Sequence, residues 1–305
     1  MPISSRSFEI ILLMYLFVPC TGWACSCDLA DTGFLFPSGI EVPANIGGIP
    51  WFGIVEERFG VIESPPKGAF SVEIHIGNEW QPVEFEYWKQ FSPRSPSADF
   101  QMDMLLVRPQ EGFVPGTRYR FNFEATGHSI RPFGSETDMR RQSIDLFVSQ
   151  DKLTGSSDPT ILKISKQKYG FVRIASGGSC SQEIESAYRM MKLFLPDEIL
   201  RWSDSVLYFC WIDEHWAWRP SHYLCSIVPP GKSWMGPGQE VVFIACGSHY
   251  RMRFELTRGE HTIRMEAVLP GTDISFQDSG SFSLDCGDTM RRYRSGLESE
   301  TQSDQ

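Results

Sequence analysis

Two pairs of metal-ligating side chains lie close together in the last third of the chain. His222 and Cys225 are separated by two residues, and so are Cys246 and His249. Imidazole nitrogen and thiolate sulfur are ligands that zinc prefers, and this internal spacing is found in zinc sites. The same cysteines would form disulfides in an oxidising compartment, because thiols oxidise there before they bind zinc. The compartment therefore decides between a metal site and disulfides.

The segment WIDEHWAW combines aromatic rings with polar side chains. Exposed tryptophan rings stack on sugars, and carboxylate and imidazole groups supply directional hydrogen bonds. The alternative is that the tryptophans pack inside or between domains, as large aromatic side chains usually do. The residues of this candidate platform for a glycan or another ligand are Trp211, Asp213, Glu214, His215, Trp216 and Trp218.

Motifs of the common enzyme classes are absent from the sequence. It contains no G-x-S-x-G, no H-E-x-x-H, no phosphate-binding glycine loop and no EF-hand. On a strand, the adjacent acids Asp213 and Glu214 would point to opposite faces, which is unsuitable for a catalytic carboxylate pair. We therefore expect a non-enzymatic protein without catalytic residues or a cofactor.

The first residues have the pattern of a secretory signal peptide. Arg6 precedes an apolar run over residues 10–18, and the small residues Gly22 and Ala24 follow it. This pattern predicts a leader over residues 1–24. The apolar run is too short to span a bilayer, and the sequence contains no other run of spanning length. We expect export to the periplasm, the outer cell envelope or the extracellular space.

Cleavage after Ala24 would leave seven cysteines, an odd number. Cys25 would begin the mature chain, where bacterial lipoproteins carry their acyl chains, so we assign it to a lipid anchor or a free thiol. Export favours disulfides over zinc for the remaining cysteines, although the sequence does not fix their pairing. The six disulfide candidates are Cys27, Cys180, Cys210, Cys225, Cys246 and Cys286.

Apolar and polar residues alternate repeatedly between residues 44 and 150, after an irregular lead-in over residues 25–43. The runs 70–76, 119–123 and 144–148 each have a period of two. This period is typical of strands with one buried and one exposed face. Several such strands in succession, separated by turn residues, predict an antiparallel β-sandwich.

A polar segment over residues 151–159 is predicted as a linker to a second domain. Strand patterns then return over residues 160–287, which contain five of the six disulfide candidates. We predict a second β-sandwich held together by disulfides. Residues 181–200 fit either a helix or strands. Residues 288–305 are polar and are predicted as a disordered tail.

Residues 36–150 resemble the immunoglobulin-like domains of bacterial surface and S-layer proteins. Those domains carry a Pro-Gly-Thr-x-Tyr phrase before their final strands, and Pro115, Gly116, Thr117 and Tyr119 match it here. They also open with a Val-Pro-x-Asn phrase, which residues 42–45 match. The resemblance implies a tyrosine whose hydroxyl bonds to the backbone of the preceding turn. A generic likeness over residues 256–273 extends it to two tandem immunoglobulin-like β-sandwich domains.

The net charge of −10 argues against nucleic acid and anionic membrane surfaces as partners. We therefore expect a structural or adhesive protein whose partners are proteins or glycans at the cell surface. One alternative is a ligand-binding module that uses the tryptophans of WIDEHWAW. A third reading is a metal-binding envelope protein that uses the two His–Cys pairs.

Overall fold

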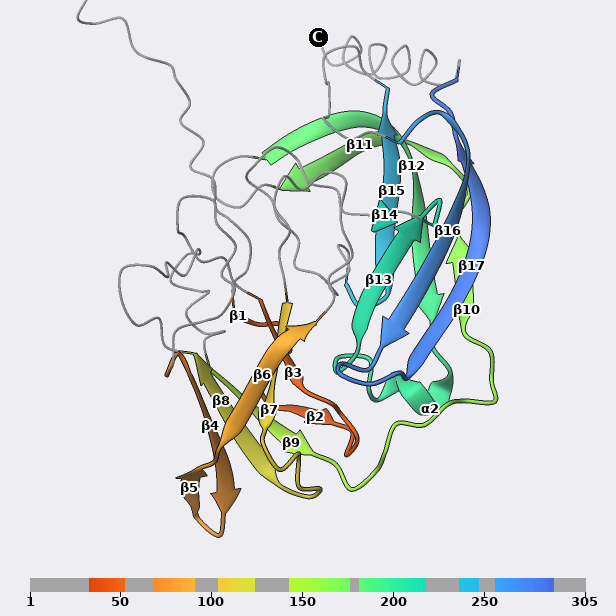
Figure 1. The fold of residues 1–305 in the computed structure, drawn as a ribbon. Coiled ribbons are helices and arrows are strands. Elements are labelled where there is room, and N and C mark those ends of the chain that lie inside the picture. The colour runs from red at the N-terminus through yellow and green to blue at the C-terminus, as the bar shows by residue number, and fades with distance from the viewer. Residues whose placement is uncertain are drawn as a thin grey trace, which may run out of the picture.

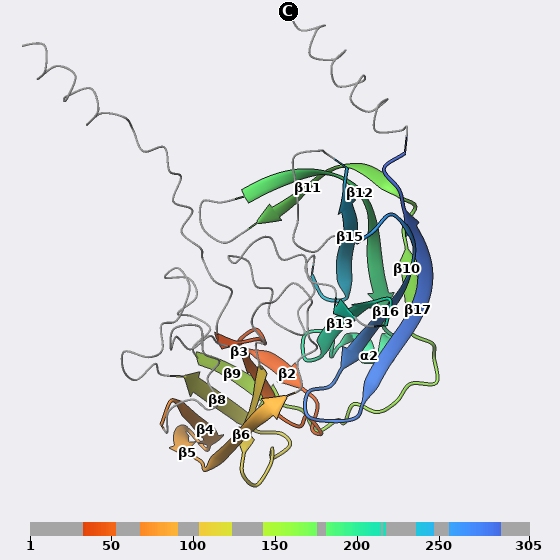
Figure 2. The same ribbon diagram turned by 45° about the horizontal axis from the view of Figure 1, so that its top comes forward.

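The computed structural model describes residues 33–52, 68–90, 104–123, 143–175, 181–214, 216–217, 236–246 and 256–287. These residues form an all-β protein, as the alternation predicts, and α2 (Asp197–Leu200) is the only helix among them. None of the described residues forms a helix long and apolar enough to cross a membrane. Figures 1 and 2 show two groups of sheets side by side, one from residues 33–148 and one from residues 161–284. The predicted leader and the predicted tail lie outside the described residues.

The first group, which we call the first sheet pair, consists of two sheets. One has the order β1-β3-β7-β6 and the other has the order β2-β9-β8-β4-β5. Neighbouring strands are antiparallel except β2 and β9, which are parallel. The strands are β1 (Gly33–Phe34), β2 (Ile40–Val42), β3 (Ile49–Phe52), β4 (Phe70–Ile76), β5 (Glu79–Pro82), β6 (Phe85–Gln90), β7 (Met104–Pro109), β8 (Arg118–Phe123) and β9 (Ser143–Val148).

Aromatic side chains fill the space between these two sheets. Trp51 of β3 packs against Phe70 of β4 and Phe123 of β8, with ring centroids 5.4 and 4.5 Å apart. All three side chains are buried, and burial of one such side chain stabilises a fold by roughly 1.5–3 kcal/mol. The alternating pattern of β4 and β8 thus turns their apolar residues inward and leaves their polar residues on the outer face.

The tyrosine bond implied by the resemblance is present. The backbone N–H of Val114 donates to the Tyr119 hydroxyl at 3.0 Å. Tyr119 is buried, its burial raises the pKa of the phenol, and the Phe113 ring packs edge-on against it at 5.4 Å. The prediction of a hydroxyl that fastens the turn before β8 is confirmed.

The second group, the second sheet pair, also consists of two sheets. In one, the long strand β12 pairs with β10 and β11 along one edge and with β15 along the other. The other sheet has the order β14-β13-β16-β17. The strands are β10 (Ile161–Ile164), β11 (Lys168–Ala175), β12 (Ser181–Phe194), β13 (Leu207–Ile212), β14 (Trp216–Ala217), β15 (Gln239–Ala245), β16 (Gly259–Val268) and β17 (Ser275–Leu284).

Residues 181–200, for which the sequence left helix and strand open, form mainly strand. β12 takes up 14 of these residues, and the four residues of α2 follow it. Tyr188, Met190 and Lys192 of β12 pair with three residues of β15, so the strand lies inside its sheet. Residues 186–188 and 191–192 are paired on both edges, so neighbouring strands provide the backbone hydrogen bonds that a helix would otherwise make within itself.

A disulfide joins the two sheets of the second pair. Cys246 follows β15 and Cys286 follows β17, and their Cα atoms are 5.5 Å apart. Both residues belong to the six disulfide candidates. Cys210 is buried within β13. The other cysteines with predicted roles lie outside the described residues: Cys25, Cys27, Cys180 and Cys225.

The two sheet pairs meet at a close backbone contact. The N–H of Gly47 donates to the carbonyl of Pro270 in the β16–β17 turn at 2.9 Å. Residues 151–159, the predicted linker, also pack against the first sheet pair: Leu153 is buried, and its N–H and C=O both bond to the Asn45 side chain at 2.8 Å. A single cluster of buried hydrophobic residues extends through both pairs. Their relative orientation is therefore held by packing and hydrogen bonds.

Candidate functional site

The predicted platform lies on a hairpin at one end of the β14-β13-β16-β17 sheet. Trp211 is near the end of β13, and Asp213 and Glu214 form the turn that follows, with φ of 52° and 61°. The two acids therefore lie in a turn and not on a strand, because the chain reverses at them and pairs Ile212 with Trp216. His215 and Trp218 lie outside the described residues, as does the side chain of Trp216.

The Trp211 side chain is half-buried and already engaged by its neighbours. Its indole N–H donates to Glu266 at 3.3 Å, and the Arg264 guanidinium lies over its ring, 5.1 Å from the centroid. Arg264 also pairs with Glu266 and donates to Gln277 at 3.2 Å. A ligand that stacks on Trp211 would therefore find one ring face covered and the N–H already in use.

Asp213 fastens the turn to the neighbouring strand β16. One carboxylate oxygen accepts a hydrogen bond from the Thr262 N–H at 2.9 Å, and the other lies 2.8 Å from Nδ1 of His261. Partial burial alone would raise the pKa of Asp213. The hydrogen bonds from His261 and Thr262 and the charge of His261 outweigh it, so the pKa falls below its ordinary value.

His261 has both ring nitrogens occupied. Nε2 lies 2.8 Å from the carbonyl of Thr257, which only accepts, and Nδ1 faces the ionised Asp213. Each ring nitrogen therefore already has a hydrogen-bond partner within the protein. The side chain is 5% exposed and contacts the ring of Phe282. Because neither nitrogen is open to a substrate, we assign this pair to holding the turn rather than to acid–base chemistry.

The His–Cys pairs do not provide the four metal ligands that the sequence suggested. Cys246 is joined to Cys286, so its sulfur is not a thiolate that could bind zinc. The metal-binding interpretation is wrong for this residue. The other three members of the set, His222, Cys225 and His249, lie outside the described residues.

Sequence reasoning missed the residues that surround Trp211 and Asp213. His261, Arg264 and Glu266 belong to one strand whose alternation places His261 on the buried face and the other two on the outer face. That alternation was visible in the sequence, but the pairing of β16 with β13 was not.

No protein-family model matches the chain, and none of the curated proteins compared with it matches either.

Proposed function

We propose that the chain is an exported structural or adhesive protein built from two tandem immunoglobulin-like sandwiches. The strand order of the first sheet pair supports this. If β1 to β9 are lettered A, A′, B, C, C′, D, E, F and G, one sheet is A-B-E-D and the other is A′-G-F-C-C′. In the second sheet pair, β10 and β11 together are lettered A, and β12 to β17 are lettered B, C, C′, E, F and G. One sheet is then A-B-E and the other is C′-C-F-G.

The observation that carries the structural role is the contact between the two sheet pairs. Gly47 and Gly271 approach so closely that a Cβ on Gly47 would lie 2.3 Å from the Gly271 carbonyl oxygen. Interfaces between domains of one chain usually permit relative motion, whereas packed and hydrogen-bonded junctions restrict it. A fixed arrangement suits a protein that presents surfaces at a set distance and angle.

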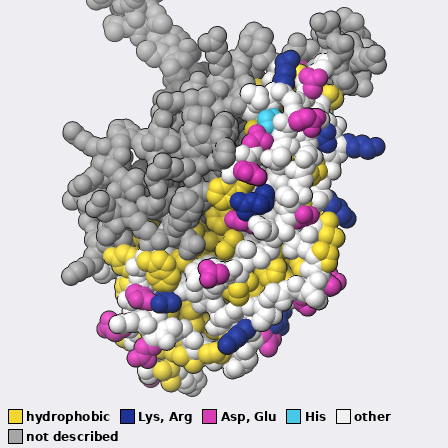
Figure 3. All heavy atoms as spheres, turned by 45° about the vertical axis from the view of Figure 1, so that its right-hand side comes forward, with side chains coloured by type: hydrophobic (Ala, Val, Ile, Leu, Met, Phe, Trp, Pro, Cys, Tyr) yellow, Lys and Arg dark blue, Asp and Glu magenta, His cyan; other side chains and the backbone are white. Residues whose placement is uncertain are grey.

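The disulfide supports export. Disulfides form and persist mainly in secreted and periplasmic proteins, because cytosolic reductants keep thiols reduced. The side of the molecule shown in Figure 3 mixes acidic and basic side chains without a large area of one charge. Such a surface favours mixed polar contacts with proteins or glycans over binding to a polyanion.

Two measurements test the proposal. Intact-mass spectrometry of the protein produced with its leader in a bacterial host should find cleavage after Ala24, with a mass increase on reduction and alkylation. Beads coated with the purified protein should adhere to the producing cells, whereas beads coated with the reduced and alkylated protein should not. A mass that retains residues 1–24 contradicts export, and equal adherence of both bead preparations contradicts the folded adhesive role.

A ligand site at Trp211 is the second candidate, favoured by the partial exposure of a tryptophan beside Arg264, Glu266 and Gln277. The double variant Trp211→Ala with Trp218→Ala tests it by retention on immobilised glycans. A folded double variant with unchanged retention excludes this site.

A further inference from the structure

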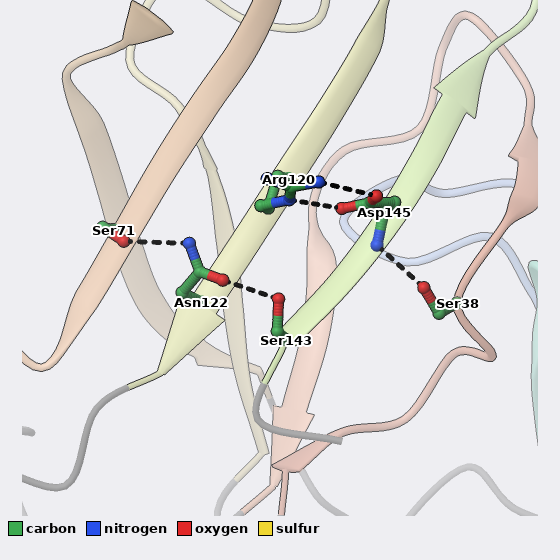
Figure 4. Close-up of polar contacts among 6 residues, drawn as sticks. All are labelled: Ser38, Ser71, Arg120, Asn122, Ser143 and Asp145. Atoms are coloured by element: carbon green, nitrogen blue, oxygen red, sulfur yellow. Dashed lines mark hydrogen bonds and ion pairs between the residues drawn. The ribbon is translucent and has the colours of Figure 1, made fainter. Parts of the chain in front are cut away.

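The outer face of the β2-β9-β8-β4-β5 sheet carries an ordered row of polar side chains (Figure 4). The Asn122 amide in β8 donates to the Ser71 hydroxyl in β4 at 3.2 Å. Its carbonyl oxygen accepts from the Ser143 hydroxyl in β9 at 2.6 Å. The three residues are register partners, so the row runs straight across three strands.

A second row lies beside the first and contains an ion pair and an aromatic ring. Arg120 donates to both carboxylate oxygens of Asp145, at 2.7 and 3.1 Å, and the Asp145 N–H donates to the Ser38 hydroxyl at 3.0 Å. The same guanidinium stacks on Trp80 of β5, 4.2 Å from the ring centroid, and the His75 ring lies 5.0 Å from that ring. Arg120 thus links the β9 side of the sheet to its β5 edge, and the ion pair raises the pKa of Arg120.

We propose that this outer face binds a neutral polysaccharide, a partner class that rests on the proposed adhesive function. Sugar hydroxyls are donors and acceptors at once, so they need a surface that offers both. Within the described residues, no acceptor takes the Ser71 hydroxyl proton or the second amide hydrogen of Asn122, and the Ser143 oxygen accepts no hydrogen bond. Ser71 and Ser143 are exposed and Asn122 is half-buried, so these groups face solvent.

The charge on this face favours a neutral ligand. Its outward positions hold two arginines, Arg118 and Arg120, against three carboxylates, Glu41, Glu73 and Asp145. The arginine that Figure 4 shows is already paired with a carboxylate. An anionic polymer or an anionic membrane would meet an excess of negative charge here, and it would have to displace Asp145 from Arg120.

Two aromatic side chains of the same face lie beside these rows, one toward each edge of the sheet. Trp80 is half-buried on β5, and Phe147 of β9, which pairs with Glu41 of β2, is 37% exposed. Aromatic rings provide rigid apolar surface for the C–H faces of sugar rings. The hydrogen bonds and the ion pair hold the polar side chains in place before a ligand arrives, which lowers the entropy lost on binding.

Affinity electrophoresis of the purified full-length protein tests the proposal. Gels that contain hydroxyethyl cellulose, galactomannan or dextran provide neutral probes, and alginate provides the anionic one. At least one neutral polysaccharide should retard the protein and alginate should not. Trp80→Ala and Ser71→Arg should each weaken that binding about tenfold or more, as loss of a central contact residue does. The matched variants Phe171→Ala and Ser281→Arg alter exposed residues of the second sheet pair and should bind as the wild type does.

Several outcomes would overturn the proposal. They are no retardation by any neutral polysaccharide, retardation by alginate alone, full affinity in Ser71→Arg, or loss of binding in Phe171→Ala or Ser281→Arg. Because Ser71 is exposed, Ser71→Arg decides the question even if Trp80→Ala does not fold. If Trp80→Ala abolishes polysaccharide binding but beads coated with this variant still adhere, the polysaccharide is not the partner in adhesion, and the adhesive function stands. If the protein binds a polysaccharide but its beads do not adhere, the adhesive function is refuted and the polysaccharide site stands.

Discussion

Replacement of Gly47 by alanine tests whether the two sheet pairs form one fixed unit. A Cβ at this position would lie 2.3, 2.5 and 2.6 Å from the carbonyl oxygen, carbonyl carbon and Cα of Gly271. All three are backbone atoms of the β16–β17 turn, so no side-chain rotation relieves the clash. Gly47 does not have a positive φ, so alanine suffers no backbone strain of its own there. The substitution therefore acts on the junction alone.

The expected cost follows from the overlap. Non-bonded carbon atoms prefer separations of about 3.5–4.0 Å, so the two backbones must move apart by roughly 1 Å. Overpacking of this kind typically costs about 1–3 kcal/mol. The movement also breaks or weakens the 2.9 Å hydrogen bond from the Gly47 N–H to Pro270, which contributes roughly 1 kcal/mol. The free energy of unfolding should fall by about 2–4 kcal/mol.

Guanidinium-induced unfolding of the full chain, followed by tryptophan fluorescence, measures this change. Small-angle X-ray scattering should also show a larger radius of gyration for Gly47→Ala, because the sheet pairs separate. Gly155→Ala is the matched control: a Cβ there meets no atom within 4 Å, and its stability should stay within about 0.5 kcal/mol of the wild type. Equal stability and equal scattering of the two variants would refute the fixed junction.

Three further predictions concern single contacts. Replacement of both Cys246 and Cys286 by alanine should lower the free energy of unfolding in denaturant by about 3–4 kcal/mol, because the bridge closes a loop with a separation of 40 residues; an unchanged midpoint would contradict this. Tyr119→Phe should cost about 1 kcal/mol, since the Val114 N–H loses its partner, and a thermal denaturation scan that matches the wild type would count against it. Asp213 has a pKa below its ordinary 3.8 in the fold, so its stabilisation is present above that value and is lost as the pH falls through the folded-state pKa. Thermal scans from about pH 5 to pH 2 should therefore show a steeper loss for the wild type than for Asp213→Asn, by a modest amount because the side chain is half-exposed; parallel curves would refute this role.

Sequence alternation located the strands because burial decides their pattern. In β4 and β8, one face packs against the opposite sheet and the other meets solvent, so a period of two is recorded directly in the residues. The Tyr119 bond could also be anticipated, since all its determinants lie within six residues of chain. Local patterns of this kind need no knowledge of which strands pair.

The turn at Asp213 could not be predicted in this way. Aspartate is common in turns, but glutamate is not, and two successive residues other than glycine rarely both have a positive φ. Contacts with His261 and Thr262, which are 48 and 49 residues away, stabilise the reversal. A short sequence window contains no record of those contacts. The same holds for Arg120 and Asp145, which are 25 residues apart and meet only through the register of β8 and β9.

The two sheet pairs contain similar groups in different states of use. In each pair, an arginine lies over a tryptophan ring and forms an ion pair with a carboxylate. Arg120 of β8 lies over Trp80 and pairs with Asp145 in the first, and Arg264 of β16 lies over Trp211 and pairs with Glu266 in the second. The indole N–H of Trp211 donates to Glu266, whose side chain is only 16% exposed. The polar groups of that arrangement are therefore already paired with one another.

No described acceptor takes the indole N–H of Trp80, and the carboxylate paired with Arg120 is 43% exposed. A ligand can therefore bond to the first arrangement without breaking an existing contact, whereas at Trp211 it must compete with Glu266. Competition of that kind leaves a polar group of the protein to find another partner, which costs about 1–3 kcal/mol when the group is buried. This difference is why we place the polysaccharide on the first sheet pair and treat Trp211 as a packing residue of the second.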